Sequence, residues 1–164
     1  AVDDKAMDVM AIVGRLNRKV GAFGIGRFSG LEHLAGGEKV LEVREAPAAA
    51  ILMDAYRHLE TAVLDAELLR EKLSMEQLWT REAVEGRWYG GLRLSADAFI
   101  RQSAAQVSGS VCYVLRPGAM DVCAIKADRP LYLTNRDAWE KQQATDQPWV
   151  DVGSAMGLDE EVSA

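Results

Sequence analysis

Apolar side chains recur at helical spacing near the start of the chain. Residues 21–26, which read Gly-Ala-Phe-Gly-Ile-Gly, end the predicted helix because glycine reaches left-handed backbone geometry at little cost. Residues 27–34 and 39–46 predict two strands joined by a hairpin turn at 35–38. The positions that form the helical stripe are Val9, Ile12, Val13, Leu16 and Val20.

Helical spacing returns after this hairpin. Pro47 is predicted to open a helix, where its missing N–H costs nothing, and apolar positions continue through Ala66. The pattern restarts near Ser74, whose Ser-Met-Glu-Gln sequence has the capping-box form, and the helix that begins there ends before Gly86. Ser95 is predicted to cap a fourth helix.

The last third predicts a second hairpin and a short helix. Residues 109–116 and 120–126 are the expected strands, with Pro-Gly at 117–118 between them, and the helix follows Thr134. Hairpins mixed with long helices predict an α+β fold of antiparallel hairpins packed with long helices. We expect one domain at residues 1–152 and a short acidic tail at 153–164.

Charge and composition exclude several classes of protein. The formal net charge of −6 argues against a nucleic-acid partner, which would need clustered Lys and Arg. No apolar run approaches the roughly 20 residues of a membrane span, and no signal peptide is visible at the start. The two cysteines are too few for a disulfide scaffold, so a reduced, cytoplasmic protein is expected.

The cysteines nevertheless have a predicted position. If residues 117–118 form a two-residue turn, Arg116 pairs with Ala119, and counting back places Cys112 opposite Cys123. Opposed strand residues have Cβ atoms about 4.5–5.5 Å apart, slightly long for a relaxed disulfide. The two thiols are therefore predicted to lie side by side but unbonded.

Motifs for independent catalysis are missing from the sequence. The glycines at 21, 24 and 26 follow a helix and enter a strand, whereas a phosphate cradle feeds the N-terminus of a helix. No Ser/His/Asp order or metal-ligand spacing is present, and His58 has the setting of an ordinary helix residue. No catalytic, cofactor-binding or metal-binding residue is predicted.

Three segments resemble the carboxyl-terminal domain of argininosuccinate synthase. That family carries a Gly-Arg-His-Gly-Val/Ile-Gly-Arg turn, a Val-Glu-Asn-Arg strand, and a Lys-Ser-Arg-x-x-Tyr-Glu-x-Pro strand exit. Here residues 21–27 read Gly-Ala-Phe-Gly-Ile-Gly-Arg, 31–34 read Leu-Glu-His-Leu, and 42–47 read Glu-Val-Arg-Glu-Ala-Pro. The spacing from Gly24 to Pro47 aligns without a gap, and weaker similarity extends over about residues 14–152.

The resemblance implies an ATP-dependent ligase of arginine biosynthesis, which joins citrulline to aspartate through citrullyl-AMP. In the family, a nucleotide-binding domain with a Ser-Gly-Gly-Leu-Asp-Thr-Ser loop precedes this region, and nothing here matches that loop. ATP and Mg would therefore act only through an absent or partner nucleotide-binding domain, and the chain alone is expected to be inactive. Self-association as a dimer or tetramer, and a separate nucleotide-binding subunit, are the implied partners.

Two substrate-binding positions carry over from the family. Glu32 stands where the family uses a Glu to bind the polar groups of citrulline, and Arg44 replaces the family's Tyr. If the backbone is kept, the two side chains face one cavity with little water and pair as an Arg–carboxylate fork. Citrulline should then bind weakly or not at all. The family's Arg-His is replaced at 22–23 by Ala-Phe, and its Ser-Arg at 40–41 by Val-Leu.

Three functions stay open at this point. The first is a module of an argininosuccinate synthase-like ligase that completes a substrate site and builds oligomers. The second is a diverged, non-catalytic interaction or oligomerisation protein. The third is a module adapted to a different amino-acid-like substrate, whose extra carboxylate would take over Arg44 and leave Glu32 for its amine.

Overall fold

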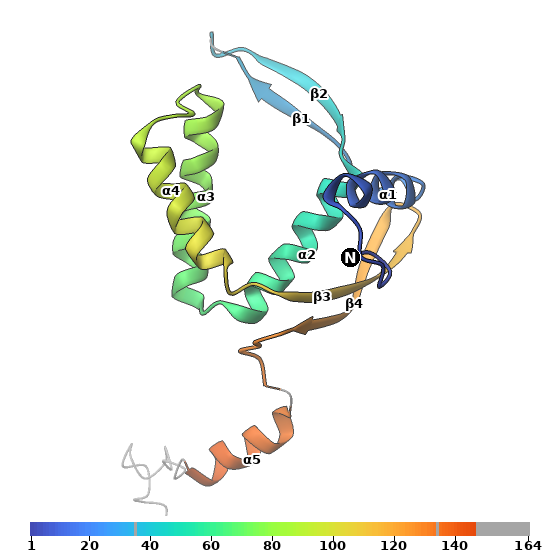
Figure 1. The fold of residues 1–164 in the computed structure, drawn as a ribbon, viewed down its shortest axis with the longest axis vertical. Helices are drawn as coiled ribbons and strands as arrows, with labels where there is room; N and C mark the ends of the chain where they lie inside the picture. Colours follow the sequence, from blue (N-terminus) through green and yellow to red (C-terminus); the bar gives the residue numbers. More distant parts are fainter. Residues whose placement is uncertain (35, 134, 147–164) are drawn as a thin grey trace, which may run out of the picture. The chain divides into compact units, whose positions relative to one another are not determined.

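The structure, a computed structural model, describes residues 1–34, 36–133 and 135–146 of the 164-residue chain. It divides into two compact units, Ala1–Leu131 and Tyr132–Ala164. In their described residues, the first unit holds four helices and two antiparallel hairpins, and the second holds the helix α5 (Arg136–Asp146) (Figure 1). The predicted α+β class, with hairpins and long helices, is confirmed.

The N-terminal helix and the first hairpin form as the hydrophobic pattern predicts. Helix α1 (Val9–Gly21) is capped by Asp8, whose carboxylate accepts the Ala11 N–H at 2.9 Å. Strands β1 (Arg27–His33) and β2 (Lys39–Glu45) pair antiparallel and project from the base formed by α1 and α2 (Figure 1). Leu16 and Val20 of α1 are buried in the core beside the turn that leads into β1.

The three middle helices differ from the prediction at their starts. Helix α2 (Pro47–Val63) opens at Pro47 as expected, and α3 (Ala66–Val84) ends before Gly86. The predicted start at Ser74 is wrong, because Asp65 caps α3 by accepting the Leu68 N–H at 2.9 Å. The Ser74 hydroxyl instead donates to the Arg70 carbonyl inside the helix.

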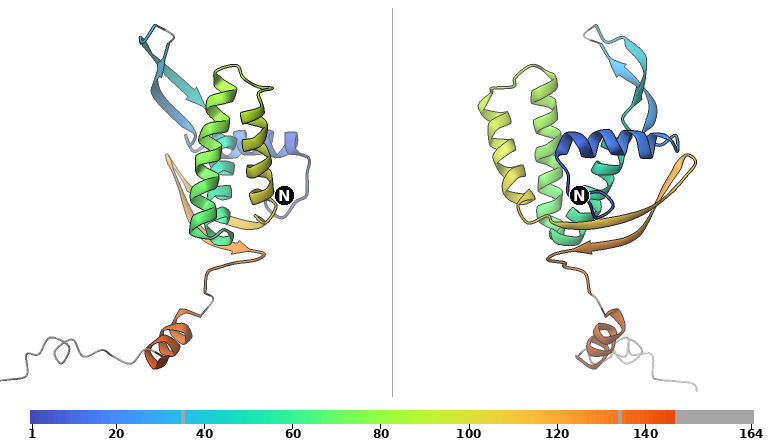
Figure 2. Two further views of the ribbon diagram at one scale, coloured as in Figure 1. Left: turned by 90° about the vertical axis from the view of Figure 1, so that its left-hand side faces the viewer. Right: turned by 45° about the vertical axis from the view of Figure 1, so that its right-hand side comes forward.

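The fourth helix also begins earlier than predicted. Helix α4 (Gly91–Ala104) has Gly90 as its N-cap, and Ser95 lies inside it, so the predicted cap at Ser95 is wrong. Helices α3 and α4 pack side by side as an antiparallel pair (Figures 1 and 2). Trp79 and Trp88 meet edge to face at 5.5 Å between ring centroids, with the Arg93 guanidinium over both rings.

The second hairpin packs along α2. Strands β3 (Gly109–Arg116) and β4 (Ala119–Ala127) pair antiparallel, and their inner face contributes Leu115, Met120 and Ile125 to two clusters of buried side chains. Arg116 pairs with Ala119 as predicted. A β-bulge at Cys123 shifts the register between Cys112 and Tyr113, so Cys112 is opposite Ala124 and the predicted direct pairing with Cys123 is wrong.

The glycine turn between α1 and β1 has a structural role. Gly26 lies at φ 81°, and a Cβ there would lie 2.5 Å from the Pro47 Cα at the start of α2. Its carbonyl accepts the Ala46 N–H at 2.8 Å, and the Gly118 N–H donates to the Phe23 carbonyl. The close approach of two backbones therefore requires glycine, and the turn ties both hairpins to α1 and α2.

We predict that Gly26→Ala destabilises the protein by about 3 kcal/mol or more, because left-handed strain and a backbone clash add together. Gly24→Ala is the matched control, since Gly24 has a similar φ of 73° but a Cβ at that position would meet no atom within 4 Å. Strain alone then costs about 1–2 kcal/mol. Urea unfolding measures both. Equal losses for the two variants would contradict the role assigned to the close approach.

Candidate functional site

One face of the β1–β2 hairpin carries the first candidate site. Register places Phe28, Gly30 and Glu32 of β1 on one face with Glu42 and Arg44 of β2. These residues line a hollow of about 360 Å³. Gly30 lies opposite Glu42 in the ladder, and Phe28 lies opposite Arg44.

Glu32 and Arg44, the two substrate-binding positions predicted from sequence, meet in this hollow. The Arg44 Nη2 lies 2.9 Å from the Glu32 Oε2, so the predicted pairing is present. The same guanidinium contacts the Glu42 carboxylate, with its Nε 2.5 Å from the Glu42 Oε2. Sequence reasoning did not single out Glu42, although its place two residues before Arg44 on a strand puts both on one face.

The environment of this pair differs from the expectation. The Arg44 and Glu32 side chains are 57% and 45% exposed, so water reaches a contact that was expected to be nearly dry. An exposed ion pair contributes about 0.2–1 kcal/mol, well below the cost of breaking a buried one. The pair therefore opposes a competing ligand only modestly.

Two carboxylates share one cation in the hollow. When protonated, the Glu32 carboxyl donates a hydrogen bond to the Glu42 carboxylate, and this bond, followed by the repulsion of the Glu42 charge, raises the pKa of Glu32 above its usual value. Hydrogen bonds to Glu32 and Arg44 lower the pKa of Glu42. Glu32, Glu42 and Arg44 together carry a net charge of −1 when both carboxylates are ionised, so this face attracts a cationic group more than an anionic one.

The opposite face of the same hairpin is apolar and open to solvent. Leu31 lies across from Leu41, with Val43 beside them, and the three side chains are 64%, 65% and 74% exposed. A two-stranded hairpin with an uncovered apolar face is only marginally stable in water. These three residues, here called the apolar hairpin face, form a contiguous surface suited to contact with another protein surface.

A larger groove runs between α2 and the α3–α4 pair. It encloses about 930 Å³, and apolar side chains including Met53, Leu73, Trp79 and Ile100 form much of its wall. Charged residues, among them Arg57 and Glu76, lie along it. Sequence reasoning did not predict this groove, because each of its residues reads as an ordinary position of one helix.

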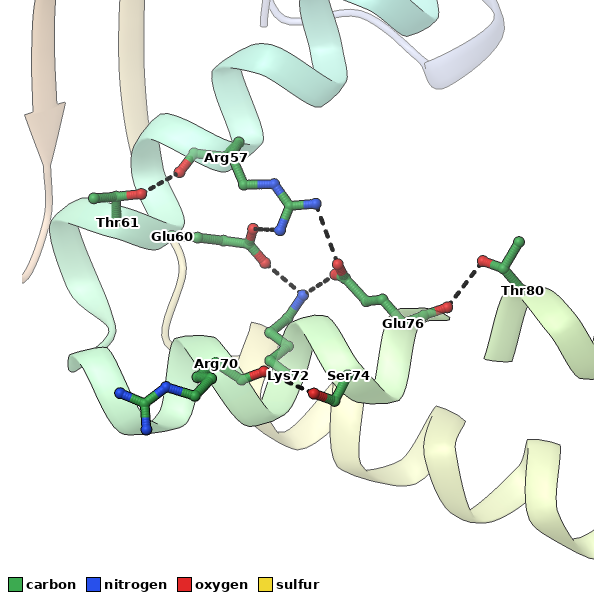
Figure 3. A network of polar contacts seen from close by, with 8 residues as sticks. All are labelled: Arg57, Glu60, Thr61, Arg70, Lys72, Ser74, Glu76 and Thr80. Carbon is green, nitrogen blue, oxygen red and sulfur yellow. Dashed lines mark hydrogen bonds and ion pairs between the residues drawn. The ribbon is translucent and has the colours of Figure 1, made fainter. Parts of the chain in front are cut away.

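An ion cluster, drawn in Figure 3, lies beside the groove, which two of its members, Arg57 and Glu76, line. Lys72 of α3 is 1% exposed and contacts the carboxylates of Glu60 and Glu76, while Glu60 of α2 is fully buried. Arg57 Nη1 lies 3.1 Å from the Glu60 Oε2, and its Nη2 lies 3.2 Å from the Glu76 Oε2. We call Arg57, Glu60, Lys72 and Glu76 the α2–α3 ion cluster.

The cluster balances two positive and two negative charges. Burial by itself lowers the pKa of Lys72, but its hydrogen bonds to Glu60 and Glu76 outweigh this effect and hold the pKa above its ordinary value. The Lys72 ammonium also lies 5.2 Å from the centre of the Tyr56 ring. Lys72 is therefore fixed in its charged form, which is the behaviour of a structural residue rather than a proton-transfer group.

Other groups with catalytic chemistry are dispersed. Among residues 1–34, 36–133 and 135–146, no three His, Cys, Asp or Glu side chains gather in a way that could hold a metal ion. His58 lies on α2 with its Nε2 3.5 Å from the Asp54 Oδ2 one turn away. In the same described part of the chain, no helix is long and apolar enough to cross a lipid bilayer.

Comparison with protein families decides the relationship. The sequence-family model of the arginosuccinate synthase C-terminal domain matches residues 1–154 of this chain. This chain belongs to the argininosuccinate synthase family, through its C-terminal domain. The resemblance drawn from the glycine turn and the two strands is therefore confirmed, and the hollow with Glu32 and Arg44 lies in the segment that carried that resemblance.

We predict that Lys72→Met destabilises the protein by about 3–5 kcal/mol, because it leaves the Glu60 carboxylate buried with less compensating charge. Lys72→Met combined with Glu60→Leu should recover most of this loss. Arg70→Ala is the control, since it removes only the exposed pair with Glu67 and should cost about 1 kcal/mol or less. If urea unfolding gives Lys72→Met a free energy of unfolding within about 1 kcal/mol of the wild-type value, a structural role for the cluster is refuted.

Proposed function

We propose that this chain is the substrate-side and assembly module of an argininosuccinate synthase-like ligase, which works with a nucleotide-binding domain. The observation that carries the proposal is the β1–β2 hairpin, which presents Glu32 in a hollow on one face and the apolar hairpin face on the other. The first face supplies polar contacts to a substrate. The second supplies a surface for the domain that brings ATP and Mg.

The chemistry of Glu32 fits an amino-acid substrate. A carboxylate accepts charge-assisted hydrogen bonds from an ammonium group or from ureido N–H groups, both of which citrulline carries. Arg44 holds Glu32 and Glu42 at once, so a citrulline molecule must compete with an existing ion pair. We therefore propose that citrulline binding is weaker than a tyrosine at position 44 would allow.

The alternative substrate with an extra carboxylate has less support. Arg44 already contacts two carboxylates, and a third acid would enter a face whose net charge is −1. One observation favours the alternative of a non-catalytic interaction protein. Glu32 and Glu42 already occupy the hydrogen-bonding groups of Arg44 that a ligand would need. The experiment below separates it from the ligase module.

Self-association is part of the proposal. Large apolar side chains are exposed around the end of α3, where Val84 ends the helix and Tyr89 lies in the following loop. Trp149, a further aromatic residue of the chain, lies outside the described residues. We propose a dimer or tetramer in the cytoplasm, a reducing compartment in which both cysteines would stay free thiols.

The test uses the chain with and without a nucleotide-binding domain from a member of the family. We expect neither MgATP binding nor argininosuccinate formation by the chain alone. With the domain present, calorimetry should show citrulline binding that Arg44→Tyr strengthens about fivefold, because it releases Glu32 from an exposed ion pair worth about 1 kcal/mol.

Arg27→Tyr is the matched control on the same strand pair. Arg27 contacts Glu45 and does not line the hollow, so this variant should leave citrulline binding unchanged. Argininosuccinate formation by the isolated chain would overturn the proposal. Citrulline binding by neither wild type nor Arg44→Tyr, with the domain bound, would favour the non-catalytic interaction protein.

A further inference from the structure

The outer face of the second hairpin holds both cysteines of the chain. Along β3 the side chains of Val111, Tyr113 and Leu115 turn inward, whereas Cys112 lies between them on the exposed face. On β4, Val122 and Ile125 turn inward, and the two residues between them are both exposed. Those two residues are Cys123 and Ala124.

The β-bulge explains why two successive residues share one face. Cys112 pairs with Ala124 and Tyr113 with Val122, so Cys123 is the extra residue that no residue of β3 opposes. In a bulge, two residues of one strand face a single residue of the other. Cys123 and Ala124 therefore both lie across from Cys112, and the two thiols meet although they are not register partners.

Contact between the thiols has a measurable consequence. A hydrogen bond from the Cys112 thiol to the Cys123 sulfur raises the pKa of Cys112 above its usual value. Cys112 therefore keeps its proton to higher pH than an ordinary cysteine. Both side chains are exposed to solvent, so a dissolved reagent can reach them.

We propose that Cys112 and Cys123 form a redox-active dithiol that low-molecular-weight disulfides convert reversibly to an intramolecular disulfide. The Cys123 thiolate attacks one sulfur of the reagent, whose S–S bond breaks and releases one thiolate. Cys112 then loses its proton and attacks the Cys123 sulfur, which releases the second thiolate. The protein loses two electrons and two protons, and the reagent is reduced to two thiols.

The bulge also sets the stability of this bond. Regular cross-strand partners have Cβ atoms about 4.5–5.5 Å apart, beyond the mean of about 3.8 Å in disulfides. The ladder does not hold Cys123, so the backbone there can shift toward Cys112. Exposed and strained disulfides are readily reduced, and the bond should therefore open again in excess thiol.

The experiment exposes the full reduced chain to glutathione disulfide and follows it by intact mass and maleimide labelling. Wild type should lose both thiols together, lose the mass of two hydrogen atoms and retain no glutathione. Cys112→Ser should instead accumulate the mixed disulfide at Cys123. Added reduced glutathione should restore both thiols of wild type.

A matched control moves one thiol along the same face. Ser110 is exposed, pairs with Lys126 and lies two residues before Cys112 on the same face of β3. The double variant Ser110→Cys/Cys112→Ser therefore keeps two outward thiols but places them farther apart along the strand. We expect its intramolecular disulfide to form at least tenfold more slowly, with mixed disulfides in its place. Stable mixed disulfides on both cysteines of wild type, or equal rates for wild type and the double variant, would overturn the proposal.

Discussion

The arrangement of the first unit depends on a charge balance between α2 and α3. Helix α2 ends at Val63 and α3 begins at Ala66, so the two helices meet in a sharp corner. Glu60 and Lys72 lie buried next to this corner, where either charge without its partner would be strongly destabilising. Their pairing, extended by Arg57 and Glu76 (Figure 3), joins α2 to α3 beside the groove that α2 forms with the α3–α4 pair.

The other end of α2 positions the hairpin that carries the candidate site. Asn17 of α1 accepts the Ala48 N–H at 2.9 Å, and Gly26 brings the start of β1 against Pro47. These contacts anchor the base of the hairpin, while its outer part exposes both faces to solvent. A rigid base with an uncovered end is the form expected of a part that another protein surface completes.

Sequence reasoning succeeded where one local rule governed the structure. The helical stripe of α1, the turn at residues 117–118 and Pro47 at the start of α2 each depend on neighbouring residues alone. It failed at Ser74 and Ser95, because Asp65 and Gly90 offered earlier starts and the helices continued through both serines. The bulge at Cys123 leaves no mark that a count of strand positions could detect.

The candidate site, like the fold, was predicted in part from the sequence. Family resemblance placed Glu32 and Arg44 in one cavity, and their contact at 2.9 Å agrees. Their exposure depends on how far the hairpin projects from the helices, which is a tertiary property. The third member, Glu42, follows from strand alternation, which puts it on the same face as Arg44. The α2–α3 ion cluster could not be predicted from the sequence. Glu60 and Lys72 occupy positions that look like those of ordinary exposed charges, and only the corner between the two helices buries them.

Hydrogen–deuterium exchange of the β1–β2 hairpin tests most directly whether another domain completes it. In the isolated chain, amides of residues 27–45 should exchange rapidly, whereas those of residues 109–127, which pack along α2, should be protected. A bound nucleotide-binding domain of the family should slow exchange in residues 27–45 and leave residues 109–127 unchanged. Equal protection of the two hairpins in the isolated chain, or no change in residues 27–45 on binding, would contradict the account.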